Sequence, residues 1–166
     1  MILAIETSCD DTCAAVVDAR GAVLANVVSS QGVHDSFGGV VPEIASRHHL
    51  ELINLVVAQA LREAGVAMSD VELIAATQGP GLVGALLVGL STAKALAAAR
   101  ELPLAAVDHL QGHVAANFLV GGADRGDESF DPPFVCLIAS AARFGEQLPY
   151  PRYLGLDAYA TGERAL

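Results

Sequence analysis

The chain has 166 residues, of which 53% are hydrophobic and 17% are charged, so an intrinsically disordered chain is excluded. Its length suits one domain of ordinary size rather than two. Acidic residues outnumber Lys and Arg by 19 to 9, which gives a formal net charge of −10. Because phosphate contacts dominate affinity for nucleic acid, we expect that this chain does not hold RNA by itself.

The composition also bears on the compartment. Three cysteines, Cys9, Cys13 and Cys136, are an odd number and predict no disulfide framework, which favours a reducing cytoplasm. The N-terminus has no basic segment, so we expect no signal peptide. The most apolar stretch, residues 82–99, is interrupted by Gly, Ser, Thr and Lys, and predicts a packed internal helix rather than a membrane span.

Hydrophobic periodicity predicts the elements in chain order. Three apolar runs separated by polar turns predict strands over residues 2–6, 13–18 and 23–28. Apolar residues at helical spacing predict a helix over 43–64, with Pro42 in its first turn and Gly65 at its end. The later elements are a strand over 71–77, a helix over 82–100, a strand over 104–107, a helix over 109–119 with Asp108 as its N-cap, a loop over 121–132 and a strand over 134–139. A hairpin followed by alternating units predicts an α/β domain with a mixed sheet.

His109 and His113 are the first candidates for chemistry. Four residues apart on a helix, they lie on one face, where two imidazoles can bind a divalent metal. Two unrelated polar residues near a helix start are the alternative. The metallopeptidase motif His-Glu-x-x-His has its general base directly after the first histidine, where this chain has Leu110. A peptidase would therefore lack its mechanism.

Two turns are candidates for anion binding. Residues 6–12 gather hydroxyls and carboxylates after the first strand, and could hold phosphate or a metal, or form an ordinary polar turn. Residues 79–81, Gly-Pro-Gly, precede a helix. For them we favour a stiff turn with close backbone packing, with Gly84 and Gly89 allowing another element to approach.

The remaining histidines and cysteines carry weaker signals. His48 and His49 lie beside Arg47 on the predicted helix, so we expect a solvated polar face. His34 lies in a glycine-containing loop and could reach a site. Cys9 and Cys13 have no partner pair with zinc-finger spacing, and packing is the expected role.

Taken together, these segments resemble the TsaD family, also called Gcp, of tRNA N6-adenosine threonylcarbamoyltransferases. The matching segments are IETSCDDT at 5–12, GGVVPEIASR at 38–47, GPGLVGALLVG at 79–89, HLQGH at 109–113 and PFV at 133–135. The resemblance covers about residues 1–140. It implies the actin-like ATPase fold, related to sugar kinases and ribonuclease H, with two α/β lobes.

The resemblance also implies an activity. The family transfers a threonylcarbamoyl group from threonylcarbamoyl-adenylate to N6 of an adenosine beside the tRNA anticodon. It implies that His109 and His113, with an aspartate from the second half, hold one divalent metal, Fe2+ by preference and Zn2+ as the alternative, which polarises the adenylate. The substrate-binding residues it implies are Ser8, Asp10, Asp11, Ile138, Ala139, Ser140, Ala141 and Ala142. The implied partners are TsaB-like and TsaE-like proteins, with tRNA bound through the complex and no membrane.

The chain departs from the family after Ile138. Where the family has a Ser-Gly-Gly-His-Thr turn, this chain has Ser-Ala-Ala-Arg-Phe at 140–144. Glycine lets a phosphate come close to the backbone, whereas the methyl group of alanine hinders that close approach. We therefore expect a TsaD-like lobe over 1–140, a divergent tail over 141–166, and no second lobe. A frameshifted or truncated gene is our hypothesis, because loss of one base converts GGC glycine codons to alanine codons. Little or no transferase activity is expected of the chain alone.

Two other functions stay open. The lobe could be a non-catalytic module of the TsaB type that dimerises through the small-residue helix near Gly84 and Gly89. TsaB lacks the histidine pair, so His109 and His113 favour TsaD. A metallopeptidase, suggested by the older family label of sialoglycoprotein endopeptidase, is disfavoured by Leu110.

Overall fold

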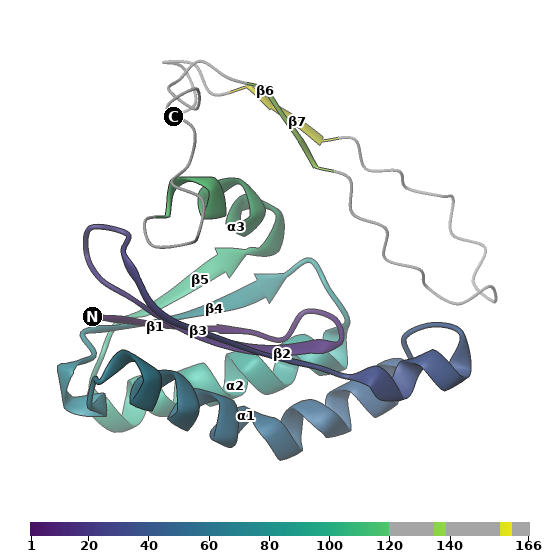
Figure 1. The fold of residues 1–166 in the computed structure, drawn as a ribbon, viewed down its shortest axis with the longest axis horizontal. Coiled ribbons are helices and arrows are strands. Elements are labelled where there is room, and N and C mark those ends of the chain that lie inside the picture. The colour runs from purple at the N-terminus through teal and green to yellow at the C-terminus, as the bar shows by residue number, and fades with distance from the viewer. Residues whose placement is uncertain (120–134, 139–156, 161–166) are drawn as a thin grey trace.

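A mixed sheet forms the centre of the fold (Figure 1). The computed structural model describes residues 1–119, 135–138 and 157–160. The five strands lie in the order β3-β2-β1-β4-β5. Their bounds are Ile2–Glu6 for β1, Asp11–Val17 for β2, Val23–Ser30 for β3, Leu73–Gly79 for β4 and Leu104–Asp108 for β5. The first three are antiparallel neighbours, whereas β1, β4 and β5 run parallel. The predicted mixed-sheet α/β class is confirmed.

Two long helices, α1 (Pro42–Ala64) and α2 (Val83–Arg100), pack side by side on one face of the sheet (Figure 1). As predicted, α1 begins at Pro42 and ends at Gly65, whose φ of 65° suits glycine. Two short 3-10 helices, η1 (Gly32–Phe37) and η2 (Met68–Asp70), connect these elements to the sheet.

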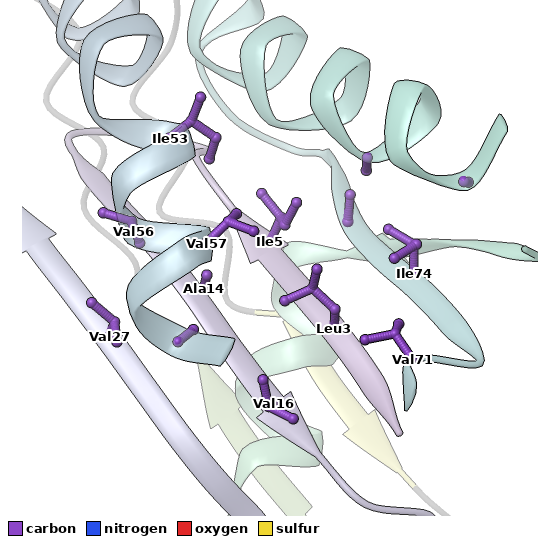
Figure 2. Packing of buried hydrophobic residues seen from close by; sticks show 14 of the residues in the cluster. Leu3, Ile5, Ala14, Val16, Val27, Ile53, Val56, Val57, Val71 and Ile74 are labelled. Carbon is purple, nitrogen blue, oxygen red and sulfur yellow. The ribbon is translucent and has the colours of Figure 1, made fainter. Parts of the chain in front are cut away.

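The hydrophobic core lies between the sheet and the two helices (Figure 2). Alternate residues of the central strands point into it, as Leu3 and Ile5 do from β1. Each such buried aliphatic side chain stabilises the fold by about 1.5–3 kcal/mol. The labelled members of this cluster are Leu3, Ile5, Ala14, Val16, Val27, Ile53, Val56, Val57, Val71 and Ile74.

Within the described residues, α2 is the one helix long and apolar enough to cross a membrane by length and composition. The core helix of a soluble protein passes the same test. One face of α2 is buried in the fold through Ala85, Ala93 and Ala97. Val83 and Leu87 are exposed.

The last described elements begin with α3 (His109–Ala115), on the opposite side of β5 from α1 and α2 (Figure 1). The helix predicted over 109–119 is shorter, because a 3-10 turn, η3 (Ala116–Phe118), replaces its end. β6 (Val135–Ile138) lies beside α3 and pairs antiparallel with β7 (Asp157–Ala160), a strand that the sequence did not predict. The predicted loop over 121–132 lies outside the described residues.

Candidate functional site

The candidate site lies where the parallel strands β1, β4 and β5 end. Glu6 closes β1, Thr77 lies near the end of β4, and His109 follows β5 directly. The carboxyl ends of parallel strands meet at one sheet edge, where α/β proteins commonly bind ligands. Residues far apart in the sequence are therefore brought together.

Asp108 sets the start of α3, as predicted. Its side chain accepts hydrogen bonds from the backbone N–H groups of Leu110 at 2.9 Å and Gln111 at 3.0 Å. This N-cap starts the helix at His109 and leaves His113 one turn further on the same face. The two imidazole rings meet edge to face, with centroids 4.6 Å apart and Nε2 atoms 3.1 Å apart.

The donor set fits a divalent transition metal. Imidazole nitrogens bind Zn2+ at about 2.0–2.1 Å, so two Nε2 atoms 3.1 Å apart are close enough to share one ion. Imidazole also suits Fe2+. Within the part of the chain that the structure describes, no group of three or more His, Cys, Asp or Glu side chains could hold a metal. The described residues therefore offer two candidate ligands, His109 and His113.

Glu6 contacts His109 at Nδ1, the ring nitrogen that does not face His113, and so orients the ring. One carboxylate oxygen, Oε2, accepts a hydrogen bond from the Thr77 hydroxyl and lies 3.1 Å from His109 Nδ1. The other oxygen accepts from the backbone N–H of Ser8. A carboxylate beside Nδ1 favours the proton on that nitrogen, which leaves Nε2 free as a metal ligand. Sequence analysis placed Glu6 in the polar turn over 6–12 but did not connect it with His109, and it did not single out Thr77, although both lie at strand ends that share one edge.

The environment of Glu6 keeps it ionised. Burial by itself would raise the pKa of the Glu6 carboxyl, but hydrogen bonds from Thr77, Ser8 and His109 outweigh burial. The net effect is a pKa below the ordinary value. A negative charge therefore lies behind His109 at neutral pH.

Ser8 is the predicted substrate residue that the structure brings to the histidines. Its Oγ lies 3.2 Å from His109 Nδ1, and its carbonyl accepts from the Leu82 N–H at 2.8 Å. A Cβ on Gly81 would lie 2.6 Å from that carbonyl oxygen. The predicted close backbone packing of the Gly-Pro-Gly turn is confirmed.

Thr7 faces helix α2 rather than the open edge. Its hydroxyl donates to the Ala85 carbonyl at 2.8 Å and accepts from the Gly89 N–H at 3.1 Å. A Cβ on Gly89 would lie 2.4 Å from the Thr7 hydroxyl, and one on Gly84 would lie 2.5 Å from the Ser46 hydroxyl. Both glycines thus serve close packing within the chain.

None of the other predicted substrate residues that the structure describes is hydrogen-bonded to the histidine pair. Asp10 is half-buried and Asp11 is exposed, and no hydrogen bond joins either described carboxylate to His109 or His113. Ile138 ends β6, whose backbone passes beside α3. The predictions for Ala139, Ser140, Ala141 and Ala142 fall outside the described residues.

The prediction of a solvated face at His48 and His49 was wrong for His49. His49 is fully buried, and its ring contacts the Thr12 hydroxyl and the Cys9 carbonyl. Spacing carries the missed signal, because His49 falls on the buried side of α1 with Ile53 and Val56. His34 is also buried and bonded within the fold.

Cys9 and Cys13 are unsuited to thiolate chemistry. Burial, with the charge of Asp10, raises the pKa of the Cys9 thiol to about 11. Burial and the charge of Asp11 raise the pKa of Cys13 to about 12. Both thiols are therefore protonated at neutral pH, in keeping with a packing role.

Comparison with known proteins decides the family. The family model for TsaD, tRNA N6-adenosine threonylcarbamoyltransferase, matches residues 22–144. The chain belongs to the TsaD family. Curated relatives of that name are 56% identical over 141 residues in Clostridium perfringens strain SM101 and in Syntrophobacter fumaroxidans. Each alignment covers 84% of this chain and 40% of the relative, so the chain spans less than half the length of these TsaD proteins.

A solved structure has a similar fold. YeaZ from Pseudomonas aeruginosa matches with a TM-score of 0.50 and 25% identity, over 64% of this chain and 44% of that chain. The predicted fold class, one lobe of an actin-like ATPase, is confirmed. The family to which the chain belongs is a family of acyltransferases, as the name threonylcarbamoyltransferase indicates.

Proposed function

We propose that this chain contributes the metal-holding half of a threonylcarbamoyltransferase site. The reaction moves a threonylcarbamoyl group from threonylcarbamoyl-adenylate to N6 of an adenosine beside the tRNA anticodon. The observation that carries the proposal is the pair of His109 and His113 Nε2 atoms 3.1 Å apart, with Glu6 behind His109. Membership of the TsaD family supports the choice of reaction.

Each residue of the site has a defined task in this proposal. His109 and His113 hold one metal, Fe2+ or Zn2+, which when bound orients and polarises the carbamoyl-adenylate as a Lewis acid. Glu6 keeps the His109 proton on Nδ1. Ser8 lies beside His109 and presents a hydroxyl to the adenylate, while Asp10 follows in the same turn and Asp11 begins β2.

The net negative charge of the chain indicates which kind of partner the reaction needs. A chain with net charge −10 repels a tRNA backbone, so a TsaB-like or TsaE-like protein supplies the basic surface. We place the reaction in the cytoplasm. With two histidine ligands among the described residues, the isolated chain binds metal weakly and has little or no transferase activity.

A chimera tests the proposal directly. In the Clostridium perfringens relative, the aligned segment is replaced by that of this chain and assayed on unmodified tRNA with threonylcarbamoyl-adenylate. We expect modified adenosine from the chimera, and at least a hundredfold loss for His109→Gln or His113→Gln. His48→Gln is the matched control, because it removes a histidine that does not contact the site. A folded His113→Gln chimera as active as its parent would contradict the proposal.

A dimerising module is the second candidate function. Large apolar side chains on the neighbouring helices α1 and α2 are exposed, at 64% for Leu50, 65% for Leu55, 82% for Val83 and 62% for Leu87. Gly84 and Gly89 themselves face inward, so these outward side chains would form the contact. The partner is a second copy or a TsaB-like protein. Sedimentation should show a dimer that Val83→Glu dissociates, whereas a monomeric parent that binds no TsaB-like protein would exclude this function.

A further inference from the structure

A buried chain of polar side chains contacts the β1–β2 turn at the Cys9 carbonyl. His49 lies at its centre, with Nδ1 2.8 Å from the Thr12 hydroxyl and 3.4 Å from Gln31 Nε2. On its other side, His49 Nε2 lies 3.1 Å from the Cys9 carbonyl. His34 continues the chain, with Nε2 2.9 Å from Gln31 Oε1. All four side chains are buried.

The backbone fixes the direction of every hydrogen bond in this chain. The N–H of Val41 can only donate, so His34 Nδ1 accepts at 3.3 Å and the proton of His34 lies on Nε2. His34 then donates to Gln31 Oε1, which turns the Gln31 amide nitrogen toward the Ala45 carbonyl and His49. That nitrogen can only donate as well.

The tautomer of His49 follows from its neighbours. Gln31 Nε2 and the Thr12 hydroxyl both face Nδ1, so Nδ1 accepts and the single proton lies on Nε2. Nε2–H therefore donates to the Cys9 carbonyl. In this arrangement every buried polar side-chain atom of the described residues has a partner. An imidazolium would place a second donor against Gln31, so the network requires neutral His49.

The turn is thus held at two neighbouring residues by different elements. Ser8 is fixed through Glu6 and through the Leu82 N–H at the start of α2. Cys9 is fixed through His49 of α1. Ser8 is also the residue that reaches His109, so the shape of the turn decides where its hydroxyl lies.

We propose that His49 is a positioning residue, which through its Nε2–H bond to the Cys9 carbonyl holds the Ser8–Asp11 turn against the histidine pair. This role rests on the proposed function, since the turn is the proposed adenylate-binding segment. The contacts of the His49 ring are with Thr12, Gln31 and the Cys9 carbonyl and not with His109 or His113, so His49 acts through the backbone that it fixes. Thr12 and Gln31 act indirectly, because their hydrogen bonds to His49 Nδ1 keep that nitrogen an acceptor.

Nuclear magnetic resonance of the 15N-labelled 166-residue chain at pH 7.5 tests the role. Long-range proton–nitrogen spectra should show both His49 and His34 protonated on Nε2 alone. Backbone order parameters at Cys9 and Asp10 should be about 0.85, fall below about 0.6 in His49→Leu, and stay high in the control His48→Leu. His49→Gln, whose amide can donate to the same carbonyl, should recover most of the order.

Each outcome is decisive. A proton on His49 Nδ1, or a rigid turn in folded His49→Leu, would overturn the proposal. Slow amide exchange at Leu3 and Ile74 shows that the core is intact. If His49→Leu does not fold, the proposal is tested by the tautomer of His49 in the parent chain and by the order parameters of His49→Gln. Titration with Co2+ separates the two proposals, because a parent chain with an ordered turn that binds no Co2+ contradicts the proposed function but not the role of His49.

Discussion

Glu6 Oε2 lies 3.1 Å from His109 Nδ1, although 103 positions separate the two residues in the chain. The contact exists because β1 and β5 flank β4 in the sheet, so their carboxyl ends share one edge. It joins the end of β1 to α3, the helix that carries the proposed metal ligands His109 and His113. In the proposed site, the Glu6 carboxylate therefore supports His109 through Nδ1.

Glu6→Gln should weaken both the fold and the metal site. A neutral amide cannot accept the same hydrogen bonds from Thr77, Ser8 and His109, so we expect a loss of about 1–3 kcal/mol in the free energy of unfolding. Affinity for Co2+ should fall about 10–100-fold. Urea unfolding and a Co2+ titration measure the two effects. Glu51→Gln, the same change at an exposed position of α1, should alter neither, and equal effects at both positions would refute the assignment.

Burial of His49 predicts that stability falls in mild acid. Burial lowers the pKa of His49 below its ordinary value of 6.5, although the Cys9 carbonyl and the charges of Glu6, Asp10 and Asp11 oppose the shift. The unfolded chain then takes up a proton before the folded chain does. Stability from this residue is complete above pH 6.5 and declines as pH falls below it, by up to about 1.4 kcal/mol per pH unit.

Urea unfolding between pH 7.5 and 5 measures that dependence. His49→Gln should flatten the decline, whereas His48→Gln should leave it as in the parent. The same slope in His49→Gln and the parent would assign the acid sensitivity to other groups.

Two glycine substitutions should change stability in opposite directions. In Gly89→Ala the new methyl would lie 2.4 Å from the buried Thr7 hydroxyl, and we expect a net loss of about 1–2 kcal/mol. In Gly112→Ala nothing lies within 4 Å, so helix propensity should add up to about 1 kcal/mol. Thermal unfolding compares the two. A stabilising Gly89→Ala would show that Thr7 does not occupy this gap.

Much of the fold could be predicted from sequence because its periodicities are local. The period-two burial of β1 and the helical period of α1 appear in the residues themselves. The N-cap at Asp108 was found for the same reason, since its partners are its own neighbours. β7 was missed because residues 141–166 show no clear hydrophobic period.

The site could be predicted only in part because it depends on strand order. The His109 and His113 pair follows from helix spacing, but the position of Glu6 requires knowing that β4 separates β1 from β5. His49 was misplaced because its polar neighbour Arg47 outweighed its spacing with the buried residues of α1. Its partners Thr12 and Gln31 come from other elements, which no local pattern shows.

Calorimetric and spectroscopic titration of the chain with Co2+ tests the central claim most directly. We predict one weakly bound ion per chain, with imidazole coordination, that is lost in both His109→Gln and His113→Gln and retained in His48→Gln. Binding that is unchanged when either histidine of the pair is replaced, or no binding by the folded parent, would contradict the account.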